Sequence, residues 1–361
     1  MKRICIVLPK LTAGGTERTA AELANYLVSM NIDVSILLMY KYPHFFNLDK
    51  RVKIIEPEPE IRRKLGRVLY LPYLLLFLRK NLKNLKPDSI LCLGYILFSL
   101  IAAWGIKSTV VISNRSSPYR VRFPKMKILN FLYKFLYRIL KNRVDGIIAQ
   151  TQVSADVYKK SFKCPIIVIP NFLKEMEYFP QVEKGNVIIT VGRAVPEKGQ
   201  KHFIDVVKKL SHNNMDFILL GDGPQLSDLK TYAKKLNVMD RIEFVGFSNE
   251  VDKFLAQSKV FVFTSLTEGY PNAIIEAMAH GCVPVSFNCV AGPSDIIKHG
   301  VNGYLVEVGD TDRKAHHIQN LFHNEGLLAD MSINSQEVRD TNSLNTIGKL
   351  YLDFLLLKKN K

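Results

Sequence analysis

The chain has 361 residues, 47% of them hydrophobic and 23% charged, which is typical of a globular protein large enough for two domains and unlike a disordered one. A formal net charge of +17 suits acidic partners, namely nucleic acid, an anionic membrane or phosphorylated substrates. No segment is long and apolar enough to span a membrane, and the first ten residues do not resemble a signal peptide, so export is not expected.

Short apolar runs alternate with helical patterns along the first half of the chain. A run at 3–11 ends in a glycine turn, a helical pattern covers 16–30, and a second run covers 34–40. This order of strand, turn, helix and strand is one βα unit of a parallel sheet. Further strands are expected at 88–94, 108–114, 145–151 and 164–171. The polar, aperiodic segment 174–186 then indicates a domain boundary.

The same alternation restarts at residue 187 and continues through the second half. Strands are expected from 187 and at 216–220, 241–247, 259–265, 283–288 and 303–309, and helices at 201–211, 225–238, 250–257, 272–281 and 293–300. The sequence therefore predicts an α/β fold of two Rossmann-like domains, residues 1–172 and 173–343. We expect the last helix, within 344–361, to pack back on the first domain.

Ligands of open parallel sheets bind beyond the carboxyl ends of the strands, so the turns there are candidate binding segments. Gly14 and Gly15 let a backbone approach a ligand closely, although a tight turn without a ligand gives the same pattern. Arg193 and Lys198 follow a predicted strand within "GRAVPEKGQ". Two cations at a strand end suit a diphosphate, while solvated surface charges remain the alternative.

The segment "EGYPNAIIEAMAHG", residues 268–281, carries two carboxylates eight positions apart. Glu268 ends the loop after an apolar strand, and Glu276 lies about one turn into the following helix. The amides at that helix start are unpaired and partly positive, so they can receive a phosphate or a sugar hydroxyl. A carboxylate accepts hydrogen bonds from a vicinal diol, but the helix dipole alone also favours Glu near a helix start.

These motifs resemble family 4 of the glycosyltransferases, which have the GT-B fold. The resemblance covers nearly the whole chain and rests on "GGTER", "VGRAVPEKGQ", "GDGPQLSDLK", "RIEFVGF" and the long block from "EGYPNAIIEAMAHGCVPV" to "GPSDIIKHGVNGYLV". It implies two Rossmann-like domains facing across a crevice. It also implies glycosyl transfer from a sugar nucleotide with retention of anomeric configuration and with no metal or other cofactor.

The resemblance assigns roles to particular residues. Glu276 is expected to bind the ribose, Glu268 to touch the donor sugar, and Arg193 and Lys198 to hold the diphosphate. The expected donor-binding set is Gly14, Gly15, Gly223, Phe247, Gly269, Tyr270, Pro271, Asn272 and Glu276. The backbone near Gly223 and Phe247 is expected to line the base pocket.

Two details qualify the resemblance. Many family members carry a histidine in the loop after the strand at 108–114, whereas this chain has Arg115 there, which can hold an oxygen but cannot act as a base. We therefore group Arg115 with the expected catalytic residues. The "DTD" of 310–312 imitates a metal-binding motif of another glycosyltransferase fold, but its place at a helix start predicts helix capping.

A basic amphipathic helix is expected within 124–143. Lys127, Lys134, Arg138 and Lys141 are spaced to fall on one stripe beside Phe131, Phe135 and Tyr137. Such a helix lies in a membrane interface, although its apolar side can equally pack on a sheet. The segment 61–86 has the same character. Nucleic acid fits less well, because no zinc finger or RNA-binding aromatic motif is present.

The sequence thus predicts a glycosyltransferase that moves a hexose or N-acetylhexosamine to a lipid-diphosphate-linked glycan in capsule, O-antigen or exopolysaccharide biosynthesis. The expected carrier of the sugar is UDP. It is expected in the cytoplasm, peripheral on the inner face of the cell membrane. The alternatives are a sugar-nucleotide epimerase and a basic nucleic-acid- or membrane-binding protein without catalysis. The set of Arg193, Lys198, Glu268 and Glu276 argues against the last of these.

Overall fold

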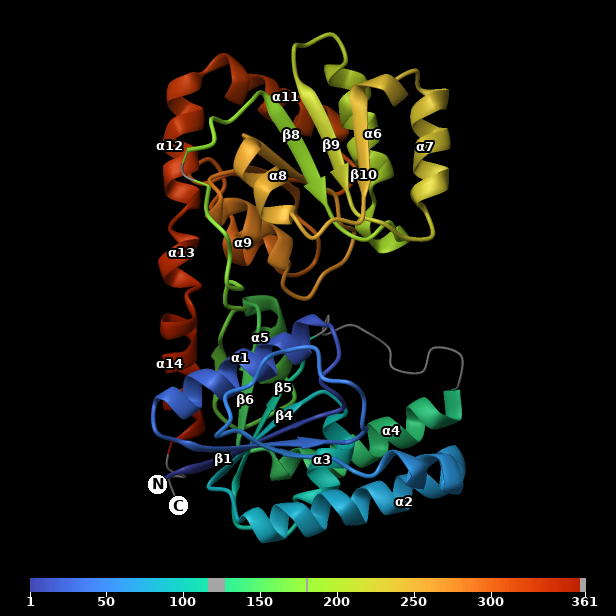
Figure 1. Ribbon diagram of the computed structural model, residues 1–361, viewed down its shortest axis with the longest axis vertical. Coiled ribbons are helices and arrows are strands. Elements are labelled where there is room, and N and C mark those ends of the chain that lie inside the picture. Colours follow the sequence, from blue (N-terminus) through green and yellow to red (C-terminus); the bar gives the residue numbers. More distant parts are fainter. Residues whose placement is uncertain (116–126, 180, 358–361) are drawn as a thin grey trace. The chain divides into compact units, whose positions relative to one another are not determined.

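The computed structural model describes residues 1–115, 127–179 and 181–357, shown as ribbons in Figure 1. The chain divides into two compact units. Unit 1 comprises Met1–Phe172 and Leu344–Lys361, and unit 2 comprises Leu173–Ser343. Each unit has its own parallel sheet and its own hydrophobic cores.

Unit 1 is built on a seven-stranded parallel sheet in the order β3-β2-β1-β4-β5-β6-β7. Its central strands are almost completely buried, because helices cover both faces, and this explains their continuous apolar runs. The strands are β1 (Arg3–Leu8), β2 (Asp33–Leu38), β3 (Lys53–Ile55), β4 (Ser89–Leu93), β5 (Thr109–Ser113), β6 (Gly146–Ala149) and β7 (Ile166–Val168).

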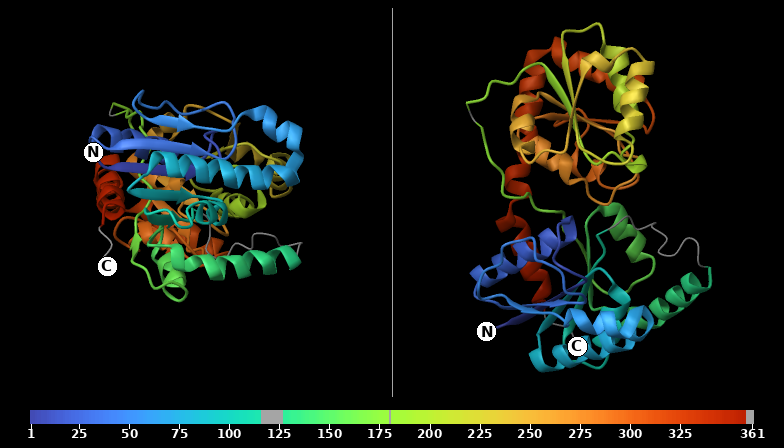
Figure 2. Two further views of the ribbon diagram at one scale, coloured as in Figure 1. Left: turned by 90° about the horizontal axis from the view of Figure 1, so that it is seen from below. Right: turned by 45° about the vertical axis from the view of Figure 1, so that its right-hand side comes forward.

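Two groups of helices cover the sheet of unit 1. One core contains side chains of α1 (Gly15–Ser29) and α14 (Leu344–Leu355), which pack against each other. The core on the other face receives side chains of α2 (Pro59–Leu85), α3 (Ile96–Ala102), the end of α4 (Lys127–Leu140) and α5 (Gln152–Lys159). The left-hand view of Figure 2 shows α4 as the long green helix along one side of this unit.

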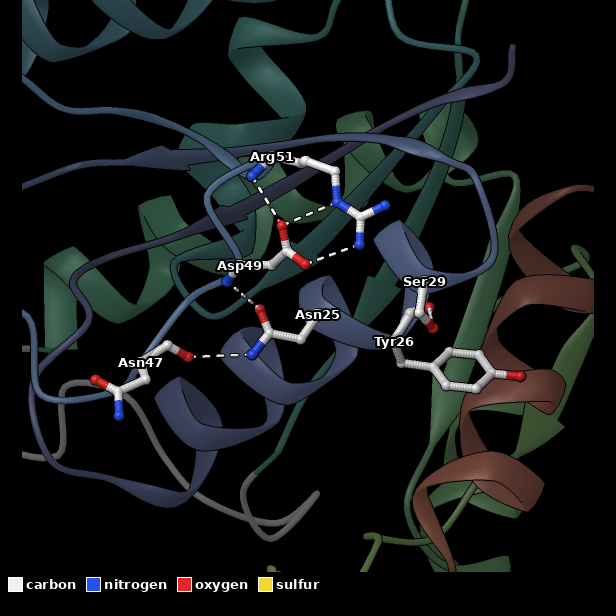
Figure 3. Close-up of polar contacts among 6 residues, drawn as sticks. All are labelled: Asn25, Tyr26, Ser29, Asn47, Asp49 and Arg51. Carbon is white, nitrogen blue, oxygen red and sulfur yellow. Dashed lines mark hydrogen bonds and ion pairs between the residues drawn. The ribbon is translucent and has the colours of Figure 1, made fainter.

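Polar contacts attach the loop before β3 to α1 (Figure 3). Asn25 of α1 donates to the carbonyl of Asn47 at 3.1 Å and accepts from the amide of Asp49 at 2.8 Å. Arg51 donates two side-chain hydrogen bonds to the Asp49 carboxylate, and these lower the pKa of Asp49 to about 2. On the other side of α1, Tyr26 points toward α14.

Unit 2 has a six-stranded parallel sheet in the order β10-β9-β8-β11-β12-β13. Its strands are β8 (Val187–Val191), β9 (Asp216–Leu220), β10 (Ile242–Gly246), β11 (Val260–Phe263), β12 (Val283–Phe287) and β13 (Tyr304–Val306). Together with unit 1 this confirms the predicted α/β class. The strand order reverses between β8 and β11, which are neighbours in the sheet although their paired residues Ile189 and Phe261 are 72 positions apart in the sequence.

Direct pairing of β8 with β11 places the point of reversal at the middle of the sheet, where Ile189 lies opposite Phe261. At such a switch point the chain segments that follow the two strands run to opposite faces of the sheet. A crevice therefore opens at the carboxyl ends of the two strands. The right-hand view of Figure 2 shows the strands of unit 2 surrounded by its helices.

The helices of unit 2 pack mainly through apolar faces on that sheet. They are α6 (Lys201–Leu210), α7 (Leu226–Lys235), α8 (Val251–Gln257), α9 (Asn272–Ala279), α10 (Pro293–Ile296), α11 (Thr311–His323), α12 (Glu325–Ser335) and α13 (Val338–Thr341). The helix expected at 293–300 is shorter than predicted, because the chain leaves the helix after Ile296. Within the described ranges, no helix combines the length and apolarity needed to cross a bilayer.

Candidate functional site

The loops that follow β8 and β11 meet at the switch point of unit 2. Thr264, one residue beyond β11, donates its hydroxyl hydrogen bond to the carbonyl of Lys198 at 2.9 Å. The amide of Leu266 donates to the carbonyl of Glu197 at 2.8 Å. These two bonds hold the loop that carries Lys198 against the loop that carries Glu268, although the two segments are far apart in the sequence.

Lys198 and Glu268 form an ion pair at this point. Lys198 Nζ lies 2.6 Å from Glu268 Oε1, and the two side chains are 30% and 13% exposed. A pair with this limited exposure is screened less by solvent than a surface pair. Lys198 also lies 5.8 Å from the ring centre of Phe263, the last residue of β11. The structure therefore places together a cation and a carboxylate that the sequence predicted separately.

Glycines allow the close approach of these loops. Gly199 has φ +58°, and a Cβ there would stand 2.4 Å from the carbonyl oxygen of Thr264. Gly221, in the turn after β9, has φ +141°, and a Cβ would stand 1.9 Å from the carbonyl oxygen of Gly192. Both positions require a residue without a side chain. Gly199 and Gly221 belong to glycine-containing turns that were predicted after strands, but no role was assigned to them, and Thr264 was not singled out.

Helix α9 brings the second carboxylate to the same edge of the sheet. Its residues Ile274, Ile275, Ala277, Met278 and Ala279 are buried. Asn272 and Glu276 are only half-buried and lie one turn apart, so they share a face of the helix. No side chain caps the start of α9, where Pro271 is the N-cap residue. Because α9 follows β11, this start lies at the carboxyl ends of the strands.

Two predicted donor-binding residues have buried side chains instead. Tyr270 is 9% exposed, and its hydroxyl accepts a hydrogen bond from Asn342 Nδ2 at 3.0 Å. Burial raises the pKa of Tyr270 above its usual value. Pro271 is buried as well, close to Gly292. These rings therefore pack within unit 2, and the surrounding backbone, including Gly269, is the part of the segment that remains half-buried.

The remaining predicted residues of unit 2 also follow strands of its sheet. Arg193 follows β8 and is exposed. Gly223 follows β9, and its amide donates to Asp222 Oδ1 at 2.6 Å. Phe247 follows β10 with 77% of its surface exposed. The loops of β9 and β10 are joined by a 2.8 Å bond from the amide of Gly221 to the carbonyl of Gly246. An exposed aromatic ring beside glycine turns can stack on a planar base.

Gly14, Gly15 and Arg115 lie in unit 1. Gly14 precedes α1, Gly15 is its first residue, and both are exposed at the carboxyl end of β1. Arg115 follows β5, and its guanidinium donates to the hydroxyl of Tyr351 at 3.1 Å and to Asn171 Oδ1. Tyr351 is fully buried in α14. Arg115 thus holds α14 on unit 1, a structural role that sequence reasoning did not foresee.

Only part of the predicted basic stripe lies on the exposed surface of α4. Lys134 and Arg138 are exposed, together with Phe131, Phe135, Leu136 and Ile139. Lys141 lies beyond the helix and donates to the carbonyl of Ser161 at 3.2 Å. The side chain of Lys127 lies outside the described part. Tyr137 does not flank the stripe as expected, because it packs into the core and stacks on Tyr133 with ring centres 6.0 Å apart.

The acidic motif at 310–312 caps a helix, as predicted. Asp310 is the N-cap residue of α11, and its side chain accepts from the amide of Arg313 at 2.9 Å. Asp312 pairs with Lys209. Across the ranges that the structure describes, no group of three His, Cys, Asp or Glu side chains could hold a metal ion.

Known proteins resemble this chain along most of its length. A 26% identical galactosaminyltransferase of Campylobacter jejuni, named for a diNAcBac-PP-undecaprenol-linked substrate, aligns over all of both chains. An Escherichia coli protein named as a UDP-Gal:GlcNAc-diphosphoundecaprenol galactosyltransferase is 32% identical over 41% of this chain and 42% of its own. The crystal structure of a glycosyltransferase from Rickettsia africae has TM-score 0.80 at 18% identity, covering 100% of this chain and 99% of that one.

Two family patterns divide the chain between them. The pattern described as "Glycosyltransferase Family 4" matches residues 13–174, and the one described as "Glycosyl transferases group 1" matches residues 172–338. The matched segments correspond closely to the two units, each with a Rossmann-like parallel sheet. The chain is a glycosyltransferase of the GT-B fold and belongs to family 4 of these enzymes.

Proposed function

We propose that this glycosyltransferase moves a hexose or N-acetylhexosamine from a sugar nucleotide, with UDP as the carrier, to a lipid-diphosphate-linked glycan. The observation that carries the proposal is the ion pair of Lys198 and Glu268 at the switch point of unit 2, with Arg193 in the loop after β8 and Glu276 in α9. Cations and carboxylates side by side suit a ligand that has both a diphosphate and sugar hydroxyls.

In this proposal each charged residue meets one part of the donor. Glu276 accepts hydrogen bonds from the ribose diol. Arg193 and Lys198 hold the diphosphate and stabilise the charge that grows on it as the glycosidic bond breaks. Glu268 orients Lys198 and accepts from a hydroxyl of the sugar. Two side-chain cations neutralise the diphosphate, so the proposed reaction needs no metal. It also retains the anomeric configuration.

The base and the phosphates have further partners in unit 2. The exposed ring of Phe247 and the turn around Gly223 would border the base. The amides at the start of α9, near Gly269 and Asn272, would receive a phosphate or sugar oxygen. In unit 1, Gly14 and Gly15 offer backbone amides at the start of α1. Arg115 uses only part of its five N–H donors on Tyr351 and Asn171, so it can also hold an oxygen of the substrate.

The acceptor is proposed to reach the enzyme at a membrane. The names of two relatives include undecaprenol carried through a diphosphate. The exposed surface of α4 combines Lys134 and Arg138 with Phe131 and Phe135, as expected of a helix that lies on anionic lipid. We therefore place the enzyme at the cytoplasmic face of the cell membrane, in the biosynthesis of a capsule, O-antigen or exopolysaccharide.

Transfer from a panel of sugar nucleotides tests this function directly. The purified enzyme is incubated with UDP- and GDP-linked hexoses and N-acetylhexosamines, with and without lipid extract from the source cell, and with EDTA in parallel. We expect one UDP-sugar to yield a glycosylated lipid, equally in EDTA. Donor consumption without a glycosylated product would favour an epimerase, and loss of transfer in EDTA would contradict metal independence.

A further inference from the structure

A cavity of about 890 Å³ lies in unit 1, and none of the candidate site residues lines it. It is lined by Thr109 and Gly146, the first residues of β5 and β6, by residues before β7, and by Phe354 and Leu357 from the end of the chain. Its volume is in the range of small-molecule sites, roughly 300–1,000 Å³. The strands run parallel, so this is the amino end of the sheet, opposite the end at which Arg115 follows β5.

The cavity has an apolar floor. Val111, Val144, Phe162 and Phe354 line it, and each is buried in the fold. Gly146 lets Phe354 approach β6, since a Cβ there would stand 2.9 Å from the phenyl ring. An apolar ligand group of modest size can therefore rest on preformed packing rather than on mobile side chains.

Four lysines surround that floor: Lys141, Lys159, Lys160 and Lys163. Lys141 donates to the carbonyl of Ser161 and Lys159 pairs with Asp156. Lys160 and Lys163 are exposed, and Lys160 also acts electrostatically on the Asp156 carboxylate. The one acid in the lining, Asp145, is bound by Arg143 at 2.9 Å and by the amide of Val110 at 2.8 Å. The rim is therefore positively charged.

We infer that this cavity binds the phosphate headgroup of an anionic lipid, with the first tail carbons on the apolar floor. Lysine ammonium groups are compact cations that bind phosphate, and the adjoining apolar floor selects an amphipathic phosphate over inorganic phosphate. Lys141 connects this site with α4, which it directly follows. The inference rests on the proposed membrane location and adds a second, specific lipid contact to it.

Titration of the full chain with a soluble probe tests the site without a membrane. The probe is dihexanoyl phosphatidylglycerol below its micelle concentration, followed by calorimetry, with inorganic phosphate and glycerol phosphate as separate arms. Replacing both lysines, Lys160→Glu with Lys163→Glu, should weaken binding about 25-fold, at roughly fivefold per lysine. The matched pair Lys234→Glu with Lys235→Glu, exposed at the end of α7, should leave binding within about twofold.

Each other outcome overturns the inference. No binding of the lipid probe, or equal binding by the Lys160 and Lys163 variant, removes the site. Equally tight binding of inorganic phosphate removes the lipid assignment. Thermal unfolding checks that the variants are folded. Failure here is separable from failure of the proposed function, because transfer from a sugar nucleotide to a soluble acceptor and sedimentation with vesicles are measured independently of this probe.

Discussion

Lys198 Nζ and Glu268 Oε1 are 2.6 Å apart. The residue expected to bind the diphosphate is therefore paired with the residue expected to contact the donor sugar. The pair joins the loop after β8 to the loop after β11, the two strands at the reversal of the sheet order. Without a donor, Glu268 fixes the position of Lys198. A bound donor would gain a cation that is already in place, so less ordering accompanies binding.

This relationship predicts coupled effects of Lys198→Met and Glu268→Gln. We expect the double-mutant cycle in the free energy of unfolding to give a coupling of about 0.5–3 kcal/mol, because the pair is largely shielded from solvent. Chemical denaturation measures it. The exposed pair Lys159–Asp156 is the control, and its coupling should stay within about 0.5 kcal/mol. Additive effects at Lys198 and Glu268 would show that the contact contributes nothing.

Arg193→Ala separates catalysis from folding. The side chain is exposed, so the free energy of unfolding should change by no more than about 0.5 kcal/mol. Turnover should fall by roughly 10²–10³, because the leaving diphosphate loses a charge partner in the transition state. Denaturation and a radiolabelled transfer assay measure the two quantities. Near wild-type turnover in a folded Arg193→Ala enzyme would exclude it from the diphosphate site.

Glu276→Ala should weaken nucleotide binding. The ribose diol would lose a charge-assisted hydrogen-bond partner, worth about 1.5–3 kcal/mol. Calorimetry with UDP and GDP measures the dissociation constants. Glu243→Ala is the matched control, since Glu243 is exposed near the amino end of β10, and it should bind nucleotide like the wild type. An unchanged dissociation constant in Glu276→Ala would end the ribose assignment.

Much of this site was predictable because its signals are local. Apolar runs marked the strands, and the turns after them marked the edge of the sheet where Arg193, Lys198, Glu268 and Glu276 lie. The contact of Lys198 with Glu268 was not predictable from those signals, because it depends on which strands are neighbours. The buried ring of Tyr270 depends in the same way on Asn342, 72 positions away.

The same reasoning explains the errors in unit 1. Spacing on a helix identifies a stripe but not the side that packs on the sheet, so Tyr137 was placed with the exposed residues although it belongs to the core. Lys141 was assigned to the helix because the sequence gives no stop signal before it, whereas α4 ends at Leu140. Arg115 had no signal for its contact with Tyr351, which comes from the other end of the chain.

The exposed surface of α4 should hold the enzyme on anionic lipid. Replacing the cations and rings, Lys134→Glu, Arg138→Glu, Phe131→Ser and Phe135→Ser, should abolish sedimentation with anionic vesicles at low salt, since each cation contributes about 1 kcal/mol. Lys141 is left unchanged because it bonds to Ser161. Transfer to a lipid-linked acceptor should fall, while transfer to a short soluble analogue should persist.

The control for this experiment is Lys234→Glu with Lys235→Glu, which changes the charge of unit 2 and should leave vesicle binding intact. High salt should weaken binding of the wild type, because attraction to a charged surface fades within a Debye length of about 8 Å at physiological ionic strength. Equal sedimentation of the α4 variant and the wild type would show that this surface is not the membrane contact.

Gly348 should be essential for seating α14 on unit 1. A Cβ at Gly348 would stand 2.6 Å from the ring of Tyr26, which points from α1 toward α14 (Figure 3). Gly348→Ala should therefore destabilise the protein by about 1–3 kcal/mol through overpacking, although alanine is the better helix former. The control is Gly326→Ala in α12, where a Cβ would meet only Asn324 Oδ1 at 3.7 Å. This substitution should stabilise the protein slightly. Denaturation of both variants gives the comparison. If the clash is the cause, Tyr26→Ala should cost less stability in the Gly348→Ala background than in the wild type. Equal stability of the two alanine variants would mean that α14 shifts freely and that the ring of Tyr26 does not fix its position.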